Sequence, residues 1–426
     1  MYTPEAIPGV SYDPVFVQNG NLDKLGNLGR KKYFQKKSII NYLYSRGSLS
    51  NPEICKLANM SSPSIHKLLR ELMDEGLVQE EGMGHSIGGR RPNIFGLIPD
   101  ARFVIGISIG QYFTEVADFN LRNEIQEEAK IYNKPLENSP LFVDGLFEFC
   151  ISVLGELRIS EEKILGIGIG ISGLTDPATG KSYSWLNYSN RTVKELFEDR
   201  FGIPVFVEND ARVMALGEFE FGNAREKNNV LCLNIGAGIG MGMILNGMVY
   251  HGNSGFAGEF GHIKVQDDGD LCICGKRGCL ETVASGAALV KAAKKEIGAG
   301  MTTKISELVD HDPEKIKSST IVEAARQGDQ LAIDLLADIG ENLGKGLATL
   351  IHLFNPEAII IGGNLSRAEQ FIVDPIQHTL NKYTIYNIKK DTEIITSTLR
   401  EKAAVMGAMS LVMSNIFEDV RNHQQV

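Results

Sequence analysis

Three amphipathic helices are predicted between residues 31 and 76, because hydrophobic side chains recur there every three or four positions. The first helix spans residues 31–46 and ends at Gly47. Residues 50–53 (Ser-Asn-Pro-Glu) have the form of a capping box, in which a hydroxyl and a carboxylate bind the free amides that open a second short helix. Residues 61–63 (Ser-Ser-Pro) place a hydroxyl cap and a first-turn proline at the start of a third helix, which stops at Gly76.

A β-hairpin is predicted directly after these helices. Two short predicted strands, residues 77–81 and 92–97, flank a polar tip at residues 82–89. Three helices followed by a hairpin form a winged helix-turn-helix, and we assign residues 29–98 to this domain. Residues 1–28 are rich in Gly, Pro, Asn and Asp without sustained periodicity, so we expect a flexible N-terminal extension there.

Strands and helices alternate through the rest of the chain, which is typical of α/β layers with ligand-binding loops at the strand ends. Two units that open with strands, near residues 103 and 230, predict two lobes around a cleft. We expect a small α/β lobe from residues 100–209 plus 396–426, and a large α/β lobe from residues 210–395. The predicted strands are 103–109, 114–116, 164–171, 205–207, 230–235, 241–244 and 358–361, and one long helix is predicted from about 321 to 354.

The composition, with 43% hydrophobic and 23% charged residues among 426, is that of an ordinary soluble protein. No apolar run approaches the roughly 20 residues that span a bilayer, and the first residues have no signal-peptide pattern. We therefore expect a cytoplasmic protein without a membrane partner. The net charge of −10 is uneven: residues 1–98 hold 12 Lys and Arg against 9 Asp and Glu, whereas the remainder holds 31 against 44. This asymmetry favours a phosphate-binding N-terminal domain on an acidic body.

The side chains of the winged helix-turn-helix favour double-stranded DNA as a partner, although a solvated helix face would have the same charge. A recognition helix places its N-terminal residues against base edges in the major groove, while the lysines of the first helix would hold phosphates. Arg90 and Arg91 lie in a glycine-rich strip of the wing, which suits a minor groove or a phosphate. The candidate DNA-binding residues of the third helix are Ser61, Ser62, Ser64, His66, Lys67 and Arg70.

Residues 258–281 form a glycine-rich segment with a concentration of metal-binding side chains. Half of the six cysteines fall within eight residues, which argues against the simpler reading that they are buried small hydrophobes. Thiolate and neutral imidazole are the ligands that tetrahedral Zn²⁺ prefers, and four of them make a closed structural site. Glu259 and Glu281 flank the segment and remain free for other contacts. The predicted zinc ligands are His262, Cys272, Cys274 and Cys279.

Two further motifs follow predicted strands. Asn209 and Asp210 stand side by side between a strand and a helix, where an amide and a carboxylate can hold adjacent sugar hydroxyls. Asp210 can also serve as a general base, or simply cap the helix. The glycine run Gly236, Gly238 and Gly240 can cradle a phosphate with its main-chain amides, although a tight hairpin turn would have the same sequence.

These motifs, in this order, resemble the ROK family of bacterial sugar kinases and sugar-responsive repressors, which share an actin-like, hexokinase-type fold. The N-terminal domain, with residues 89–92 at its end, resembles that of the family's repressor branch, which includes the xylose, N-acetylglucosamine and glucose-uptake regulators. The resemblance covers about residues 100–413 and rests on residues 208–211, 236–240, 259–262, 272–281, 355–363 and 405–408.

The resemblance implies a sugar site and a zinc site that share a histidine. It makes His262, Cys272, Cys274 and Cys279 the zinc ligands, as the residue types already suggest. Residues 172–176 match an early sugar-side loop, but Ser172 stands where the family usually has proline. His262 can serve both sites if one ring nitrogen binds metal and the other faces the sugar. The implied sugar contacts are Asn209, Asp210, Glu259, His262 and Glu281.

The chain departs from the family's kinases in both phosphate-binding segments. The kinases open their first strand with Asp-x-Gly-Gly-Thr-Lys, whereas residues 108–113 here read Ser-Ile-Gly-Gln-Tyr-Phe. In the second glycine loop, Ala237 replaces the usual threonine. Phosphoryl transfer depends on positioning and electrostatic stabilisation of the phosphates, so we expect no useful turnover. Asp210 is then a vestigial base and the loop at Gly236–Gly240 a degenerate phosphate loop.

The predicted fold is therefore α/β: an N-terminal winged helix-turn-helix followed by a two-lobed actin-like body. We expect a sugar-responsive DNA-binding transcriptional regulator, with a repressor of carbohydrate-utilisation genes as the main hypothesis. Its predicted partners are an operator duplex and a sugar or sugar phosphate, and its predicted cofactor is structural Zn²⁺. Two DNA-reading heads on one duplex require a homodimer or homotetramer. The alternative is an active ROK sugar kinase with a fused DNA-binding domain, which the retained Asp210 favours.

Overall fold

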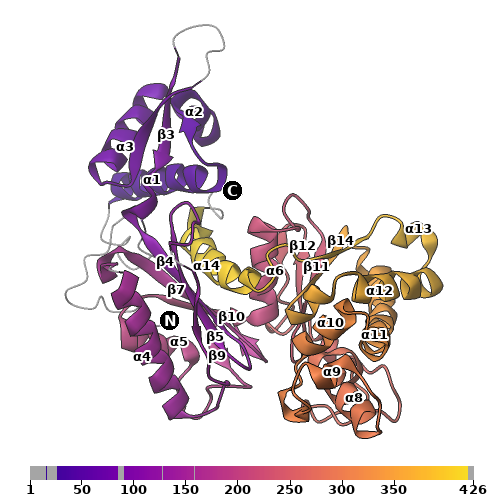
Figure 1. The fold of residues 1–426 in the computed structure, drawn as a ribbon. Coiled ribbons are helices and arrows are strands. Elements are labelled where there is room, and N and C mark those ends of the chain that lie inside the picture. The colour runs from indigo at the N-terminus through magenta and orange to yellow at the C-terminus, as the bar shows by residue number, and fades with distance from the viewer. Residues whose placement is uncertain (1–15, 17–25, 85–90, 127, 158, 421–426) are drawn as a thin grey trace.

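The computed structural model describes residues 16, 26–84, 91–126, 128–157 and 159–420, and the predicted helical head lies at one end of it (Figure 1). The capping box of α2 is confirmed: the Ser50 hydroxyl accepts from the Glu53 amide, and the Glu53 carboxylate accepts from the Ser50 amide. Ser61 is the N-cap residue of α3, but its hydroxyl lies 2.9 Å from that of Ser64 and makes no capping bond. The elements of the head are α1 (Asn27–Arg46), β1 (Leu49–Ser50), α2 (Asn51–Ala58), α3 (Ser62–Asp74), β2 (Val78–Met83) and β3 (Asn93–Leu97).

A three-stranded sheet in the order β1-β3-β2 completes the head, so the predicted wing has one more strand than the sequence pattern indicates. Helix α1 begins at Asn27, before the predicted start at residue 31. The predicted N-terminal extension lies almost entirely outside the described residues, apart from residues 26–28 and the buried Phe16, which packs in the same core as the head.

The first lobe of the body has a five-stranded sheet in the order β10-β7-β4-β5-β6. Strands β10, β7 and β4 are parallel, whereas β5 pairs antiparallel with both of its neighbours, β4 and β6. Helices α4 and α5 bury their apolar side chains against one face of this sheet. The elements are β4 (Phe103–Ile109), β5 (Thr114–Asn120), β6 (Lys130–Tyr132), α4 (Pro140–Leu157), β7 (Ile164–Ile171), β8 (Thr175–Asp176), β9 (Lys181–Ser182), α5 (Val193–Phe201) and β10 (Val205–Asn209).

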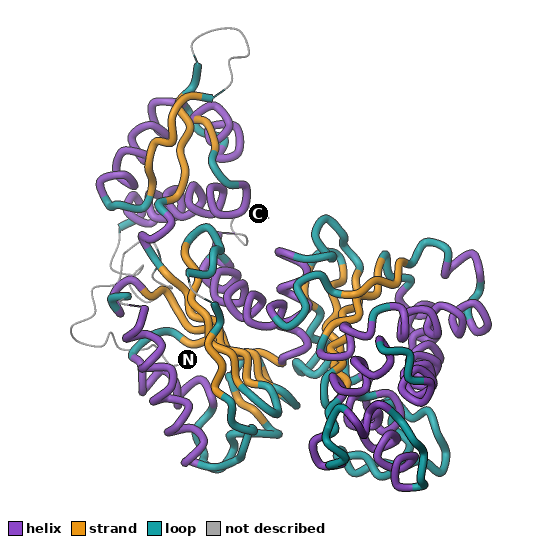
Figure 2. Tube along the Cα trace, in the orientation of Figure 1, coloured by secondary structure: helices purple, strands orange, loops and turns teal. Residues whose placement is uncertain are grey.

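The second lobe has another five-stranded sheet, in the order β13-β12-β11-β14-β15, and its large core holds most of the remaining helices (Figure 2). The prediction of one long helix from residue 321 to 354 is wrong. The segment forms two helices, α10 (Ser318–Arg326) and α11 (Gln330–Phe354). Gly328 has a φ of +80°, and the Asp329 side chain caps the second helix. The elements are α6 (Asp210–Phe221), β11 (Val230–Ile235), β12 (Ile239–Leu245), β13 (Met248–Val249), α7 (Glu281–Ala284), α8 (Gly286–Gly298), α9 (Lys304–Glu307), α10 (Ser318–Arg326), α11 (Gln330–Phe354), β14 (Ala358–Gly362), α12 (Gln370–Tyr383), α13 (Tyr386–Lys389) and β15 (Glu393–Thr396).

Helices α6 and α14 (Lys402–Ile416) lie between the two sheets and connect the lobes (Figure 1). Glycines allow their backbones to approach closely: a Cβ on Gly407 would lie 1.8 Å from the Val213 carbonyl oxygen. A Cβ on Gly168 of β7 would lie 1.8 Å from the Ala408 oxygen of α14. The apolar side chains of α14 also join the core of the head, so head, α14 and first lobe share one hydrophobic cluster. Among the described residues, no helix is long and apolar enough to cross a membrane.

Candidate functional site

The start of α6 is built by Asn209, the last residue of β10. Its side-chain oxygen accepts from the amides of Ala211 and Arg212 at 3.0 and 3.2 Å, so Asn209 is the N-cap, and the alternative of Asp210 as the cap is wrong. These two hydrogen bonds fix the orientation of the Asn209 side-chain amide. Its Nδ2 donates to the Gly173 oxygen and to Asp210 Oδ1, both at 3.0 Å.

Asp210, the first residue of α6, accepts hydrogen bonds on both carboxylate oxygens. Oδ1 accepts from the Ala211 amide at 2.9 Å and from Asn209. Oδ2 accepts from the Ser172 hydroxyl at 2.8 Å and from the Asn234 amide group at 3.3 Å. Burial raises the pKa of Asp210, while the hydrogen bond from Ser172 and the positive charge of Arg212 oppose that shift.

A buried polar network beneath this site was not predicted. Glu208 is 3% exposed and accepts from Arg212 Nε at 2.7 Å and from His251 Nε2 at 2.8 Å. The Arg212 guanidinium also donates to the carbonyls of Thr175 and Ala257, at 3.1 and 3.2 Å. Arg212 therefore connects the loop after β7 to the loop that leads to Glu259. The spacing of four between Glu208 and Arg212 was the one signal available in the sequence.

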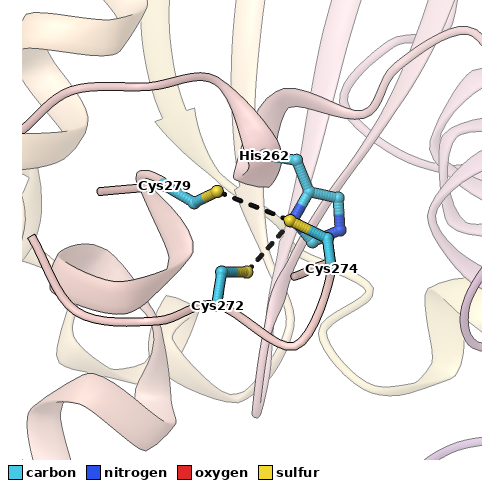
Figure 3. A group of neighbouring side chains, drawn as sticks. All are labelled: His262, Cys272, Cys274 and Cys279. Carbon is cyan, nitrogen blue, oxygen red and sulfur yellow. Dashed lines mark hydrogen bonds between the residues drawn. The ribbon is translucent and has the colours of Figure 1, made fainter. Parts of the chain in front are cut away.

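The four predicted zinc ligands meet, as Figure 3 shows. Their ligand atoms all lie within 4.8 Å of one another. Cys272 Sγ lies 3.5 Å from His262 Nδ1, and Cys274 Sγ lies 3.6 Å from Cys279 Sγ. A tetrahedral Zn²⁺ with Zn–S bonds near 2.3 Å separates its sulfur ligands by about 3.8 Å, so this group fits such an ion. The group could therefore hold a metal ion.

The metal-binding loop is shaped by tight turns at which a side chain would not fit. Gly278 has a φ of +77°, and a Cβ there would lie 1.8 Å from the Gln266 oxygen. The Cys272 amide donates to the Lys276 oxygen at 2.8 Å, which closes the turn between the first and third cysteines. Burial raises the pKa of the Cys272 and Cys279 thiols, and a bound cation would stabilise their thiolates instead.

Glu259, His262 and Glu281 lie between the metal ligands and the start of α6. His262 directs Nδ1 towards the thiols and Nε2 towards Glu259 Oε2, at 3.8 Å. Burial raises the pKa of Glu259, whose carboxylate also interacts electrostatically with His262, Arg212, Asp210 and Glu281. The structure thus brings together the five residues predicted to contact a sugar. Glu281 is less free than predicted, since its Oε2 accepts from the Ile239 amide at 3.0 Å.

The glycine run is the turn of an antiparallel hairpin between β11 and β12, in which Ile235 pairs with Ile239. The alternative of a tight hairpin turn is therefore correct, and the Gly236 amide donates within it to the Gly238 oxygen at 3.1 Å. A Cβ on Gly240 would lie 2.7 Å from the Ala211 Cβ, so this glycine lets the hairpin approach α6.

The first phosphate-binding segment of the kinases corresponds here to the end of β4 and the turn after it. Ser108 pairs with Glu115 of β5, and the Gly110 amide donates to the Phe113 oxygen at 3.0 Å. Tyr112 is 58% exposed at the tip of this turn. Burial and the nearby Glu401 carboxylate raise the pKa of Glu115 to about 7. Residues 108–113 therefore lack the lysine of the kinase segment, and the neighbouring strand β5 carries Glu115.

In the head, all six candidate DNA-binding side chains of α3 are exposed, opposite its buried leucines. Arg91 is also exposed, whereas Arg90 lies outside the described residues. The expectation that the lysines of the first helix hold phosphates is wrong for two of them. Lys36 is 8% exposed and binds Glu71 and Glu75, and Lys37 is 1% exposed and binds Asp419. Their charges are neutralised by carboxylates of the protein.

Comparisons with known proteins agree with this architecture. Residues 104–415 match the ROK family, and residues 35–79 match the winged helix-turn-helix DNA-binding family. A putative xylose repressor from Caldicellulosiruptor sp. (strain Rt8B.4) is 30% identical over 395 residues, which are 92% of this chain and 98% of the relative.

Comparisons with solved structures agree with these sequence comparisons. A crystal structure of a ROK family transcriptional regulator, a homolog of the E. coli MLC protein, has a TM-score of 0.75 and 26% identity, and covers 91% of this chain and 98% of its own. A ROK family glucokinase from Streptomyces griseus, solved with glucose and AMPPNP, has a TM-score of 0.63 and 31% identity. It covers 72% of this chain and 98% of its own.

The chain belongs to the ROK family, with an N-terminal winged helix-turn-helix domain. Within that family, the repressor and the regulator match it through the head as well as the body, whereas the glucokinase matches only about the length of the body. The predicted class, a ROK family regulator with a winged helix-turn-helix, is confirmed by these comparisons.

Proposed function

We propose that this protein is a sugar-responsive transcriptional repressor of carbohydrate-utilisation genes. The head binds an operator duplex, and the body binds a sugar or sugar phosphate. The observation that carries this proposal is the physical continuity between the two parts. Helix α6 begins at Asp210 in the polar cluster and packs against α14, whose side chains share one core with the DNA-binding head.

Ligand hydroxyls bind through the five residues that the body gathers at the start of α6. The Asn209 amide donates to the ligand in place of the Gly173 oxygen, and the carboxylates of Asp210, Glu259 and Glu281 accept, which is the pattern that adjacent sugar hydroxyls require. His262 joins this group through Nε2 while its Nδ1 faces the metal ligands. The cluster combines residues of β10, α6 and the metal-binding loop, so a bound sugar contacts both lobes.

The sugar acts by changing the angle between the lobes. A ligand shifts this equilibrium only by its difference in affinity for the two arrangements. Because α14 packs on the first lobe and on the head, the head moves with the first lobe as a unit. In a homodimer or homotetramer, such a movement changes the spacing of paired heads and therefore their fit to two half-sites.

We further propose the domain division stated above: head 29–98, small lobe 100–209 with 396–426, and large lobe 210–395. The DNA contacts are assigned to the exposed face of α3 and to Arg90 and Arg91 of the wing. Helix α14 lies between the sheets, so the boundary at residue 396 assigns a shared element to the small lobe.

The metal is Zn²⁺, held by His262, Cys272, Cys274 and Cys279. When bound, it supplies a rigid cross-link and no reactive position, since its four protein ligands complete a tetrahedron. Its effect is to fix the loop whose two ends carry Glu259 and Glu281. The His262 ring is thereby held with Nε2 towards the ligand.

A coupled binding measurement tests this function. Duplexes selected from a random library by the purified protein supply an operator, which is then titrated by fluorescence anisotropy with and without a panel of sugars and sugar phosphates. At least one compound should raise the melting temperature and change operator affinity at least tenfold, by linkage. A protein that selects no duplex, or whose duplex affinity no sugar changes, would contradict the proposal.

An active sugar kinase is the rival function, and the retained Asp210 favours it. The Asp210 carboxylate, however, already accepts four hydrogen bonds, and residues 108–113 lack the aspartate, threonine and lysine of the kinases' first phosphate-binding segment. Incubation of the protein with the same panel and Mg-ATP separates the two functions. Steady ADP release with any sugar would establish the kinase, and none is expected.

A further inference from the structure

The Asp210 carboxylate is saturated with hydrogen-bond donors in the described structure. A carboxylate offers about four acceptor positions, and among the described residues four donors reach Asp210, two on each oxygen. A ligand hydroxyl that donates to Asp210 must therefore displace one of them. The donor that gives up its hydrogen bond to Asp210 determines which group lies beside the ligand hydroxyl.

Two of the four donors are poorly suited to yield. The Ala211 amide belongs to the main chain of α6. The Asn209 amide is held because its oxygen caps that helix, and rotation would break the cap. Asn234 is the most distant donor, at 3.3 Å, and can withdraw. Oδ2 then keeps Ser172 as its partner, so a ligand hydroxyl that replaces Asn234 still lies beside Ser172.

Ser172 is the donor that can change partners at low cost. Its hydroxyl hydrogen rotates about the Cβ–Oγ bond, and its oxygen can accept as well as donate. Its main-chain amide donates to the Ile109 oxygen at 3.2 Å, so the residue is fixed between the ends of β7 and β4. The next residue, Gly173, accepts from Asn209, which places this turn directly against two of the predicted sugar contacts.

We propose that Ser172 is a specificity-determining residue of the ligand site: one sugar hydroxyl inserts between Ser172 Oγ and Asp210 Oδ2. The inserted hydroxyl accepts from Ser172 and donates to Asp210, so two hydrogen bonds replace one. Only a group that accepts and donates at once fits this position. A free hydroxyl satisfies this requirement, whereas a deoxy, fluoro or O-phosphorylated carbon does not. This inference rests on the proposed sugar-binding function.

The test is a cycle of protein and ligand variants. The panel member that most raises the melting temperature of the full-length wild-type protein is titrated calorimetrically, together with its monodeoxy and monodeoxyfluoro analogues. Ser172→Ala should weaken binding of the parent sugar about three- to tenfold, as expected for loss of one hydrogen bond between neutral hydroxyls. Ser172→Cys, with a weaker donor, should fall between the two.

The decisive result is the pattern across the analogues. The Ser172→Ala penalty should vanish for the deoxy and deoxyfluoro analogues that lack the inserted hydroxyl and persist for the others. Ser184→Ala is the matched control, because the exposed Ser184 hydroxyl accepts from the Leu174 amide at 2.9 Å and does not bond to Asp210. Ser184→Ala should change the affinity for the parent sugar less than twofold.

Two outcomes overturn the inference while leaving sugar binding intact. These are an unchanged affinity in Ser172→Ala, or a penalty of equal size for every analogue, which would mean a purely structural role. A panel in which no compound binds the wild-type protein would instead overturn the proposed function, and the inference with it.

Discussion

The Nζ atom of Lys37 lies 2.7 Å from Oδ2 of Asp419, although 382 positions separate these residues in the chain. Lys37 is 1% exposed and also donates to the Tyr33 hydroxyl at 2.9 Å. Burial lowers the pKa of Lys37, and the hydrogen bond from its ammonium to Asp419 opposes that shift. The pair links the first helix of the DNA-binding head to the segment that follows α14, beside the packing of Tyr44 on Phe417. A change in the body can therefore reach the head through a short, buried connection.

Replacement of Lys37 by Met should lower the free energy of unfolding by about 2–4 kcal/mol, because Asp419 is left without its partner in a mostly buried position. Chemical denaturation monitored by circular dichroism measures this change. The exposed Lys31→Met should change stability by less than about 0.5 kcal/mol. The double variant Lys37→Met with Asp419→Leu should recover most of the loss, and a double variant as unstable as the single one would show that the pair is not the cause.

Removal of one thiol should release the metal. Purified wild-type protein should contain about one zinc per chain, whereas Cys272→Ser should contain little, because a closed site needs all four ligands. Elemental analysis by mass spectrometry measures this directly. Cys55→Ser is the control, since Cys55 lies in the head and outside the metal-binding group. Equal zinc in both variants would contradict the assignment.

The exposed face of α3 should carry the DNA affinity. Lys67→Ala and Arg70→Ala should each weaken operator binding about tenfold or more, and loss of a phosphate contact should also reduce the slope of log K against log salt by about one. Anisotropy titrations at several salt concentrations distinguish the two roles. Lys345→Ala, an exposed position on α11 of the body, should leave affinity and slope unchanged.

Stability should depend on pH through Glu115. Burial and Glu401 raise the pKa of Glu115 from 4.5 to about 7. Between these two values the folded protein retains a proton that the unfolded chain has released, so this residue's contribution to stability falls as the pH rises. Glu115→Gln should therefore match the wild type near pH 4.5 and exceed it by roughly 1–3 kcal/mol at pH 8. Urea unfolding at both pH values tests this, and an equal difference at both would refute it.

Substitution by alanine should change stability in opposite directions at two glycines, because one is closely packed and the other is not. Gly168→Ala should destabilise the protein by more than about 3 kcal/mol, because its Cβ would lie 1.8 Å from the Ala408 oxygen. Gly155→Ala, in the exposed part of α4 with no atom within 4 Å of its Cβ, should stabilise by about 0.5–1 kcal/mol. The melting temperature of each variant, compared with that of the wild type, tests these two expectations.

Several parts of this protein could be predicted because they depend on neighbouring residues. The capping box at Ser50 and Glu53 spans three positions, and the helical spacing of apolar residues placed the helices of the head. The metal-binding group was predicted because its ligands fall within 18 residues of a glycine-rich loop. The break at Gly328 was missed because the apolar spacing continues across it, although the glycine itself was a signal.

What the sequence by itself determined is the kind of each element and the chemistry of each local motif, since both depend on φ/ψ preferences and short spacings. Only the tertiary structure decided which motifs share a site. Lys36 and Lys37 looked like phosphate ligands by charge, but folding buries them against carboxylates. Ser172 looked like a departure from a pattern until the parallel pairing of β7 and β10 brought it to Asp210, 38 positions away. Contacts across such distances follow from strand order and helix packing, which no local preference specifies.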